Sequence, residues 1–172
     1  LDERRMLHVT EGKDKKAVKA IKNYLELKGI DVNKVKDASM DMSPSFISGV
    51  LEYFPKAEIH FDRFHVVKLL NEAMDKVRQA ERKEHDELKG HKYTFLKNRN
   101  NLSDNKQKAL SELITLYPKL GEAYRLKELF NDQWEMEDEQ EALHFLVDWC
   151  NQVDKSDINP FKQFVKTIKA HW

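Results

Sequence analysis

Residues Lys34 to His65 read KVKDASMDMSPSFISGVLEYFPKAEIHFDRFH, and the predicted elements on both sides are arranged around them. This stretch predicts two short strands joined by a helix, and each strand is followed directly by an aspartate. Asp41 follows the first strand, and Asp62, with His65 three residues later, follows the second. In parallel sheets ligands and chemistry gather at the carboxyl ends of the strands. Asp41 is therefore the first candidate functional residue.

The residues on either side extend this alternation. A strand is predicted at Arg4 to Thr10, and Lys13 to Lys28 has the apolar spacing of a helix that stops at Gly29. Val35 to Met40 is the next predicted strand, Ser43 and Pro44 open a helix that stops at Pro55, and Glu58 to Phe61 is the last strand. Residues 1–65 thus read strand, helix, strand, helix, strand, an α/β pattern that implies parallel pairing with right-handed crossovers.

From residue 66 onward the pattern is helical. A long helix is predicted from 66 to about Leu88, followed by a connector at 90–101 with Tyr93, Phe95 and Leu96 as buried anchors. Further helices are expected after the cap Ser103, at 120–130, at 137–153 and from Asn159–Pro160 onward. Residues 66–172 are therefore predicted to form an all-helical insertion or bundle, which makes the chain mostly helical overall.

Composition restricts the class of protein. The 172 residues are 35% charged and 40% hydrophobic with five glycines and four prolines, which favours a soluble, helix-rich protein. No apolar run approaches the roughly 20 residues of a membrane span. The lone Cys150 excludes an internal disulfide and fits a reducing cytoplasm, and its place beside Trp149 predicts a small buried hydrophobe. The start at Leu1 and the stop at Trp172 suggest a piece of a longer protein.

Charge gives little information about a partner. The formal net charge is zero, because residues 131–157 carry nine acidic side chains against one basic. Two mildly basic stretches, 1–40 and 62–100, each carry ten basic against seven acidic side chains. Scattered cations in the second stretch could contact phosphates, although the same residues solubilise any helical protein. They are Arg63, Lys68, Arg78, Arg82, Lys83, Lys89, Lys92, Lys97 and Arg99, with Tyr93 and Phe95 among them.

Each candidate side chain has a functional and a structural interpretation. Asp41 lies between Met40 and Met42 with no cation within three positions, so it is either a metal ligand or base, or a turn aspartate. Asp62 and His65 can share one hydrogen bond or one metal ion, or act as a helix cap and a core histidine. His60 is expected on the same face as Asp62, where both could cluster with Asp41. Zinc is disfavoured there because a fourth ligand at standard spacing is lacking.

Two segments, Ser39 to Phe46 and Phe54 to Arg78, closely resemble bacterial insertion-sequence transposases of the ISL-three type. The resemblance continues more loosely to the Asn-Pro-Phe at 159–161. It implies an incomplete ribonuclease-H-like core at 1–65 and a helical insertion at 66–172. It also implies that Asp41 is the second aspartate of an Asp, Asp, Glu triad, both catalytic and metal-binding. Asp62 and His65 match a supporting Asp-x-x-His motif outside that triad.

The resemblance further implies how the full-length protein works. It would cleave and join DNA phosphodiesters at element ends with Mg²⁺ or Mn²⁺. Transposon ends and target DNA would be its partners in the bacterial cytoplasm, and a homo-oligomer is compatible with this function. The first aspartate would precede the strand at 4–10, and the glutamate would follow Trp172. Since the chain holds one ligand of three, we expect it to be inactive alone, with no tightly bound metal.

Two other functions are compatible with the residues themselves. The chain could be a noncatalytic helical interaction module in which Asp41 and His65 are structural. A metal-dependent nuclease or phosphatase with a similar strand layout is a third hypothesis, but it needs at least two more acids near Asp41.

Overall fold

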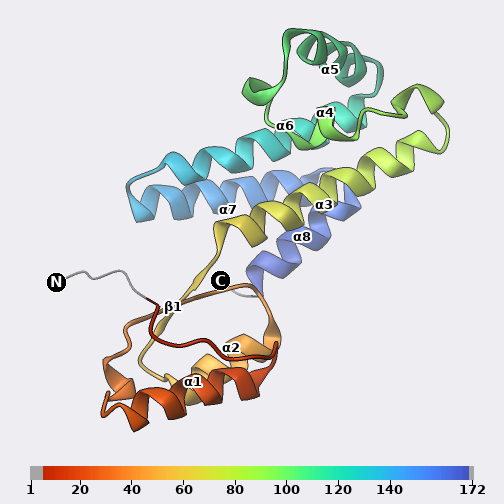
Figure 1. Ribbon diagram of the computed structural model, residues 1–172. Coiled ribbons are helices and arrows are strands. Elements are labelled where there is room, and N and C mark those ends of the chain that lie inside the picture. Colours follow the sequence, from red (N-terminus) through yellow and green to blue (C-terminus); the bar gives the residue numbers. More distant parts are fainter. Residues whose placement is uncertain (1–5, 171–172) are drawn as a thin grey trace. The chain divides into compact units, whose positions relative to one another are not determined.

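The computed structural model describes residues 6–170. Contacts between Cα atoms divide the chain into two compact units, residues 1–66 and residues 67–172, and each is described by itself. Helices dominate both units, and the described sheet has two strands (Figure 1). Among residues 6–170 no helix is long and apolar enough to cross a membrane.

The first unit is built on a parallel strand pair. Strand β1 (Asp37–Met40) pairs with β2 (Glu58–Phe61), with Asp37 opposite Glu58 and Met40 opposite Phe61. Helix α2 (Pro44–Tyr53) connects them and begins with proline at its first turn, where the missing N–H is not needed. The predicted strand–helix–strand order of this stretch is therefore confirmed.

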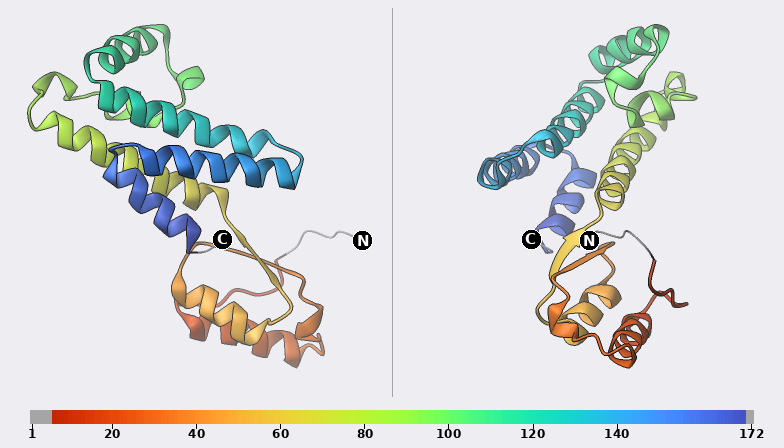
Figure 2. Two further views of the ribbon diagram at one scale, coloured as in Figure 1. Left: turned by 180° about the vertical axis from the view of Figure 1, so that it is seen from behind. Right: turned by 60° about the vertical axis from the view of Figure 1, so that its left-hand side comes forward.

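Helix α1 (Lys15–Leu27) lies alongside α2 in both views of the ribbon (Figures 1 and 2). Its N-cap Asp14 accepts hydrogen bonds from the backbone N–H groups of Lys16 and Ala17. Gly29, with φ of 72°, follows its end in the left-handed conformation that glycine adopts without a Cβ penalty. A 3₁₀ turn, η1 (Val32–Lys34), leads into β1.

The core of this unit lies between the two helices and one face of the strand pair. Val18, Val50 and Phe54 are buried, and the inward-facing strand residues Ala38, Met40 and Ile59 pack against them. Apolar residues at alternate strand positions place the other face of the pair, with its polar side chains, away from this core.

The strand predicted at Arg4 to Thr10 is wrong over residues 6–10, which form no regular secondary structure, whereas Arg4 and Arg5 lie outside the described residues. Within the described chain β1 pairs with β2 alone, and residues 6–10 make no ladder of backbone hydrogen bonds with either strand. They are held instead by α1. The His8 ring stacks on Tyr24 at 4.0 Å between centroids, and the Tyr24 hydroxyl donates to the Leu7 carbonyl.

The second unit is helical throughout its described part. Helix α3 (Arg63–Arg82) enters it from the first unit and ends earlier than the predicted Leu88, which lies in a separate 3₁₀ turn, η2 (Asp86–Leu88). The remaining elements are α4 (Lys92–Leu96), η3 (Arg99–Asn101), α5 (Asp104–Leu116), α6 (Pro118–Asp132), η4 (Gln133–Glu135), α7 (Glu139–Lys155) and α8 (Asn159–Lys169). Figures 1 and 2 both show α6 and α7 side by side.

An aromatic cluster forms the centre of this unit. Trp149 of α7 packs edge-on against Phe130 of α6 and Phe164 of α8, and its indole N–H donates to the Leu126 carbonyl at 2.8 Å. This bond satisfies the one polar group that the buried indole carries. Cys150 beside it is 1% exposed, so the prediction of a small buried hydrophobe is confirmed.

The connector before α5 is fixed by a buried lysine. Lys127 of α6 is 1% exposed, and its Nζ donates to the Lys97 carbonyl, to Asn98 Oδ1 and to Glu128 Oε1. Burial lowers its pKa, and the Glu128 carboxylate opposes that shift. Of the three predicted anchors in the connector, Phe95 is buried and Leu96 is half-buried. The prediction that Tyr93 is buried is wrong, because its side chain faces solvent.

A second buried ion pair lies on α3. Arg78 donates to Asp75 Oδ1 from Nε at 2.8 Å, and Gln79 donates to Asp75 Oδ2 at 2.7 Å, with the Lys92 ammonium 3.5 Å away. Burial alone would raise the pKa of Asp75, but the bonds from Arg78 and Gln79 together lower it. Arg78 is therefore a structural residue, which corrects its place among the cations expected to contact phosphate.

We predict that Arg78→Met destabilises the chain by about 3–5 kcal/mol, because it leaves the Asp75 carboxylate buried without its main partner. Chemical denaturation at neutral pH measures this. Because the Asp75 pKa is lowered in the folded state, its contribution is present above its unfolded pKa and is lost as pH falls through the folded value. The control is Arg82→Met, which removes an exposed cation of the same helix and should change stability by less than about 0.5 kcal/mol. Equal losses in the two variants would contradict the prediction.

We also predict that Gly49→Ala destabilises the first unit by about 1–3 kcal/mol. Alanine favours a helix, but a Cβ at Gly49 would lie 2.8 Å from Val18 Cγ2 and 2.9 Å from its Cβ, where α1 and α2 meet. Thermal unfolding of Gly49→Ala, Val18→Ala and the double variant tests this. The double variant should cost less than the sum of the single ones, and Ser48→Ala on the exposed side of α2 should cost little. Strict additivity would exclude the contact.

Candidate catalytic and metal-binding site

Two aspartates lie at the same end of the parallel strand pair. Asp41 follows β1 directly, Asp62 follows β2 directly, and the Asp62 backbone N–H donates to the Met40 carbonyl at 2.9 Å. The ladder of backbone hydrogen bonds therefore continues as far as Asp62. Both aspartates lie at the carboxyl end of the strands, where open α/β sheets place their ligands.

Asp41 is half-buried and bonded to the start of the next helix. Its Oδ1 accepts a hydrogen bond from the Ser43 backbone N–H at 2.9 Å. Ser43 occupies the N-cap position of α2 as predicted, yet its hydroxyl makes no capping bond. Asp41 Oδ2 accepts no hydrogen bond from any residue between 6 and 170, so one carboxylate oxygen remains available for a cation. The positive end of the α2 dipole also favours a negative charge at this position.

Asp62 and His65 form a closed local unit. Asp62 Oδ1 accepts from the Phe64 backbone N–H at 2.8 Å, and Asp62 Oδ2 lies 3.0 Å from His65 Nδ1. The Phe64 N–H, and after it His65, lower the pKa of this carboxyl group. Asp62 thus caps α3 and also holds the imidazole. The alternative of a core histidine is wrong, since the His65 side chain is 41% exposed.

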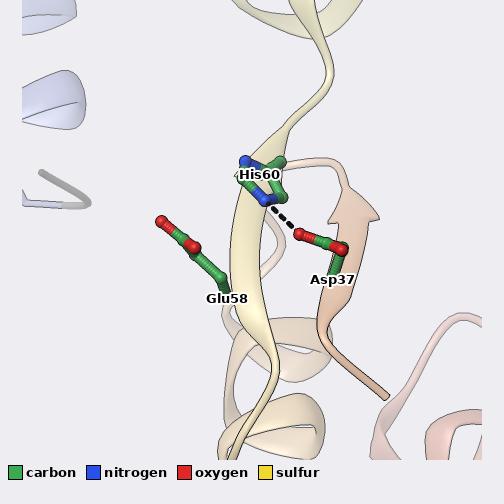
Figure 3. Close-up of side chains that lie close together, drawn as sticks. All are labelled: Asp37, Glu58 and His60. Carbon is green, nitrogen blue, oxygen red and sulfur yellow. Dashed lines mark hydrogen bonds and ion pairs between the residues drawn. The ribbon is translucent and has the colours of Figure 1, made fainter. Parts of the chain in front are cut away.

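His60 takes different partners from those predicted. It lies opposite Ser39 in the strand register, between Asp37 on one side and Asp41 on the other. Its ring turns toward Asp37, and 3.0 Å separates Nε2 from Asp37 Oδ1 (Figure 3). The predicted cluster of His60 with Asp41 and Asp62 is therefore not formed. His60 instead shares a potential metal-binding group with Asp37 and Glu58.

Asp37 and Glu58 are not among the site residues predicted from the sequence, although the spacing of Glu58 and His60 is a partial signal. Glu58 and His60 are two positions apart on one strand and therefore face the same side. Asp37 joins them only if the two strands pair in parallel with Asp37 opposite Glu58, as the structure shows. The pairing register was the unknown quantity.

Comparisons with known proteins agree with the sequence motifs. A family model for transposases of the ISL3 type, described as "Transposase", matches residues 1–172. The chain is also 26% identical over 176 residues to the transposase for insertion sequence element IS1001 of Bordetella parapertussis. That match covers 98% of this chain and 43% of the relative, so the chain spans less than half the relative's length. No solved structure matches. The chain belongs to the ISL3-type transposase family.

Proposed function

We propose that this chain is the central part of a DNA transposase catalytic domain, in which Asp41 is one of the carboxylates that bind the catalytic metal ions. The full-length protein would cleave and join DNA phosphodiesters at the ends of an insertion sequence. The observation that carries this proposal is the position of Asp41 at the carboxyl end of β1, with Oδ2 accepting no bond from the described residues. Family membership supports transposition as the reaction.

The proposed ribonuclease-H-like core needs further strands beside β1. One observation supports such an extension. An apolar cavity of about 500 Å³ lies between residues 8–12, β1 and the facing sides of α1 and α2, with Val35, Ala38 and Met40 among its lining residues. An additional strand at the open edge of β1 would continue the parallel ladder and cover this apolar surface.

The donor set suits a hard divalent cation only in part. Carboxylate oxygens are the ligands that Mg²⁺ and Mn²⁺ prefer, and Asp41 supplies one such oxygen. Both oxygens of Asp62 are already bonded, to Phe64 and His65, so Asp62 would have to give up a bond to contribute. A single carboxylate is far short of the charge that two cations require. The chain thus fits the metal as one contributor, and we expect it to bind Mg²⁺ weakly and to cut no DNA alone.

The residues of this chain would position the reaction. Bound Mg²⁺ would supply electrostatic stabilisation and an activated nucleophile for phosphoryl transfer. The Ser43 N–H fixes the orientation of the Asp41 carboxylate, so that its free oxygen is preorganised. Asp62 and His65 hold the first turn of α3 at the end of β2 through hydrogen bonds to the Asp62 carboxylate.

The alternative, a noncatalytic helical interaction module, is favoured by one specific observation. The bond between Asp41 Oδ1 and the Ser43 N–H is the bond that a purely structural turn aspartate makes. A variant that loses the charge of Asp41 but keeps this acceptor separates the two functions, because only the catalytic role needs the charge.

We predict that Asp41→Asn in the full-length transposase lowers Mg²⁺-dependent cleavage of element ends by at least about a thousandfold, because metal-ion stabilisation contributes several kcal/mol. Asparagine retains an oxygen for the Ser43 N–H, so folding and DNA binding should change little. Cleavage of a labelled element end and a DNA-binding titration measure the two effects. Asp132→Asn, at the end of α6, is the matched control. Normal cleavage by Asp41→Asn would refute the catalytic role and favour the interaction module.

We predict that His65→Ala lowers stability slightly with little effect on Mn²⁺ affinity, because it removes one partly exposed hydrogen bond to Asp62. The lowered Asp62 pKa means that this contribution is lost as pH falls through the folded pKa, below the ordinary value of 3.8. Denaturation at pH 7 and a Mn²⁺ titration of the full-length protein measure both quantities, with His144→Ala on the exposed side of α7 as control. A large loss of Mn²⁺ binding at unchanged stability would make His65 a metal ligand instead.

A further inference from the structure

The polar face of the strand pair carries a second group of potential ligands at its other end. Asp37 and Glu58 are the first residues of β1 and β2, and His60 is two positions further along β2. One ligand atom from each of the three lies within 4.8 Å of the others (Figure 3). Asp37 and Glu58 lie at the opposite end of the strands from Asp41 and Asp62, and the His60 ring contacts Asp37, so the group does not include the proposed catalytic carboxylate.

The ligand types select a class of metal ion. An imidazole nitrogen with two carboxylate oxygens suits zinc and neighbouring first-row metals, whereas Mg²⁺ prefers oxygen ligands alone. The 3.0 Å between His60 Nε2 and Asp37 Oδ1 is close to the roughly 3.3 Å that separates two ligands of a tetrahedral zinc ion with bonds of about 2.0–2.1 Å. The Glu58 carboxylate makes no hydrogen bond within residues 6–170, so it can turn to complete the group. Water would fill the remaining position.

The strand register supplies an independent argument. Asp37 lies directly opposite Glu58, and two like charges at paired positions of adjacent strands destabilise the pairing. His60 contacts only one of these two carboxylates, that of Asp37. A bound divalent cation would neutralise both carboxylates and join β1 to β2 at the start of their ladder.

The geometry points to Asp37, Glu58 and His60 as a binding site for one zinc-type divalent cation. The ion would link β1 to β2 near the first residues of the two strands. All three side chains are exposed, so the ion reaches them from solvent without opening the fold. The site is structural in character, and the proposal does not depend on catalysis by Asp41.

Calorimetric titration of the tag-free 172-residue chain with ZnCl₂ tests this, together with visible absorption after addition of Co²⁺. We expect one equivalent to bind, with at least tenfold weaker binding in each of Asp37→Asn, Glu58→Gln and His60→Ala. Zinc should raise the melting temperature of the unaltered chain and not that of Glu58→Gln. The Glu58 carboxylate has no hydrogen bond to another residue of the described part of the chain, so without metal the Glu58→Gln variant should melt no lower than the unaltered chain.

Three control variants separate this site from other sources of binding. His144→Ala removes an exposed histidine elsewhere, His65→Ala removes the other Asp–His pair, and Asp41→Asn removes the proposed catalytic ligand. Zinc affinity should stay within about twofold in all three. Absence of binding, binding unchanged in Glu58→Gln and His60→Ala, or binding lost in a control variant would each overturn the proposal. Because Asp41→Asn is read here by zinc affinity and elsewhere by DNA cleavage, failure of this site and failure of the proposed function are distinguishable.

Discussion

The parallel pairing of β1 with β2, in register from Asp37 opposite Glu58 to Met40 opposite Phe61, is the constraint on which the first unit depends. Because side chains alternate along a strand, this one register sends Ala38, Met40 and Ile59 to the helices and every acidic residue of the strands to the other face. A shift of one residue would exchange the two faces. The hydrophobic contacts with α1 and α2 therefore also fix where the carboxylates lie.

The two ends of this strand pair differ in chemistry. At the carboxyl end, Asp41 Oδ2 accepts no hydrogen bond from residues 6–170 while both oxygens of Asp62 are bonded, so these two aspartates have different capacities for a metal ion. At the other end, two acids face one another beside a single imidazole. The first arrangement suits one ligand of a larger oxygen site that the rest of a transposase would complete. The second suits a borderline metal held by this chain alone.

The helical unit is held by a different combination of forces. An aromatic cluster forms its centre, and three of its buried polar side chains are paired: Trp149 with a carbonyl, Lys127 with three oxygens, and Asp75 with Arg78. An unpaired charge in these places would be costly. The Lys127 bonds join the connector to α6, the Trp149 bond joins α7 to α6, and the Asp75–Arg78 pair lies within α3.

The sequence alone predicted the longer helices except for the end of α3, the two strands of the described sheet, the positions of Asp41 and Asp62 at strand ends, and the family. These features depend on local periodicity, caps and motif spacing, which neighbouring residues encode. Three features come from the tertiary structure: residues 6–10 form no strand, Tyr93 is exposed while Lys127 is buried, and His60 contacts Asp37 instead of Asp41. Each of these depends on a partner distant in the chain, and the register of such a pairing is set by packing across the whole unit.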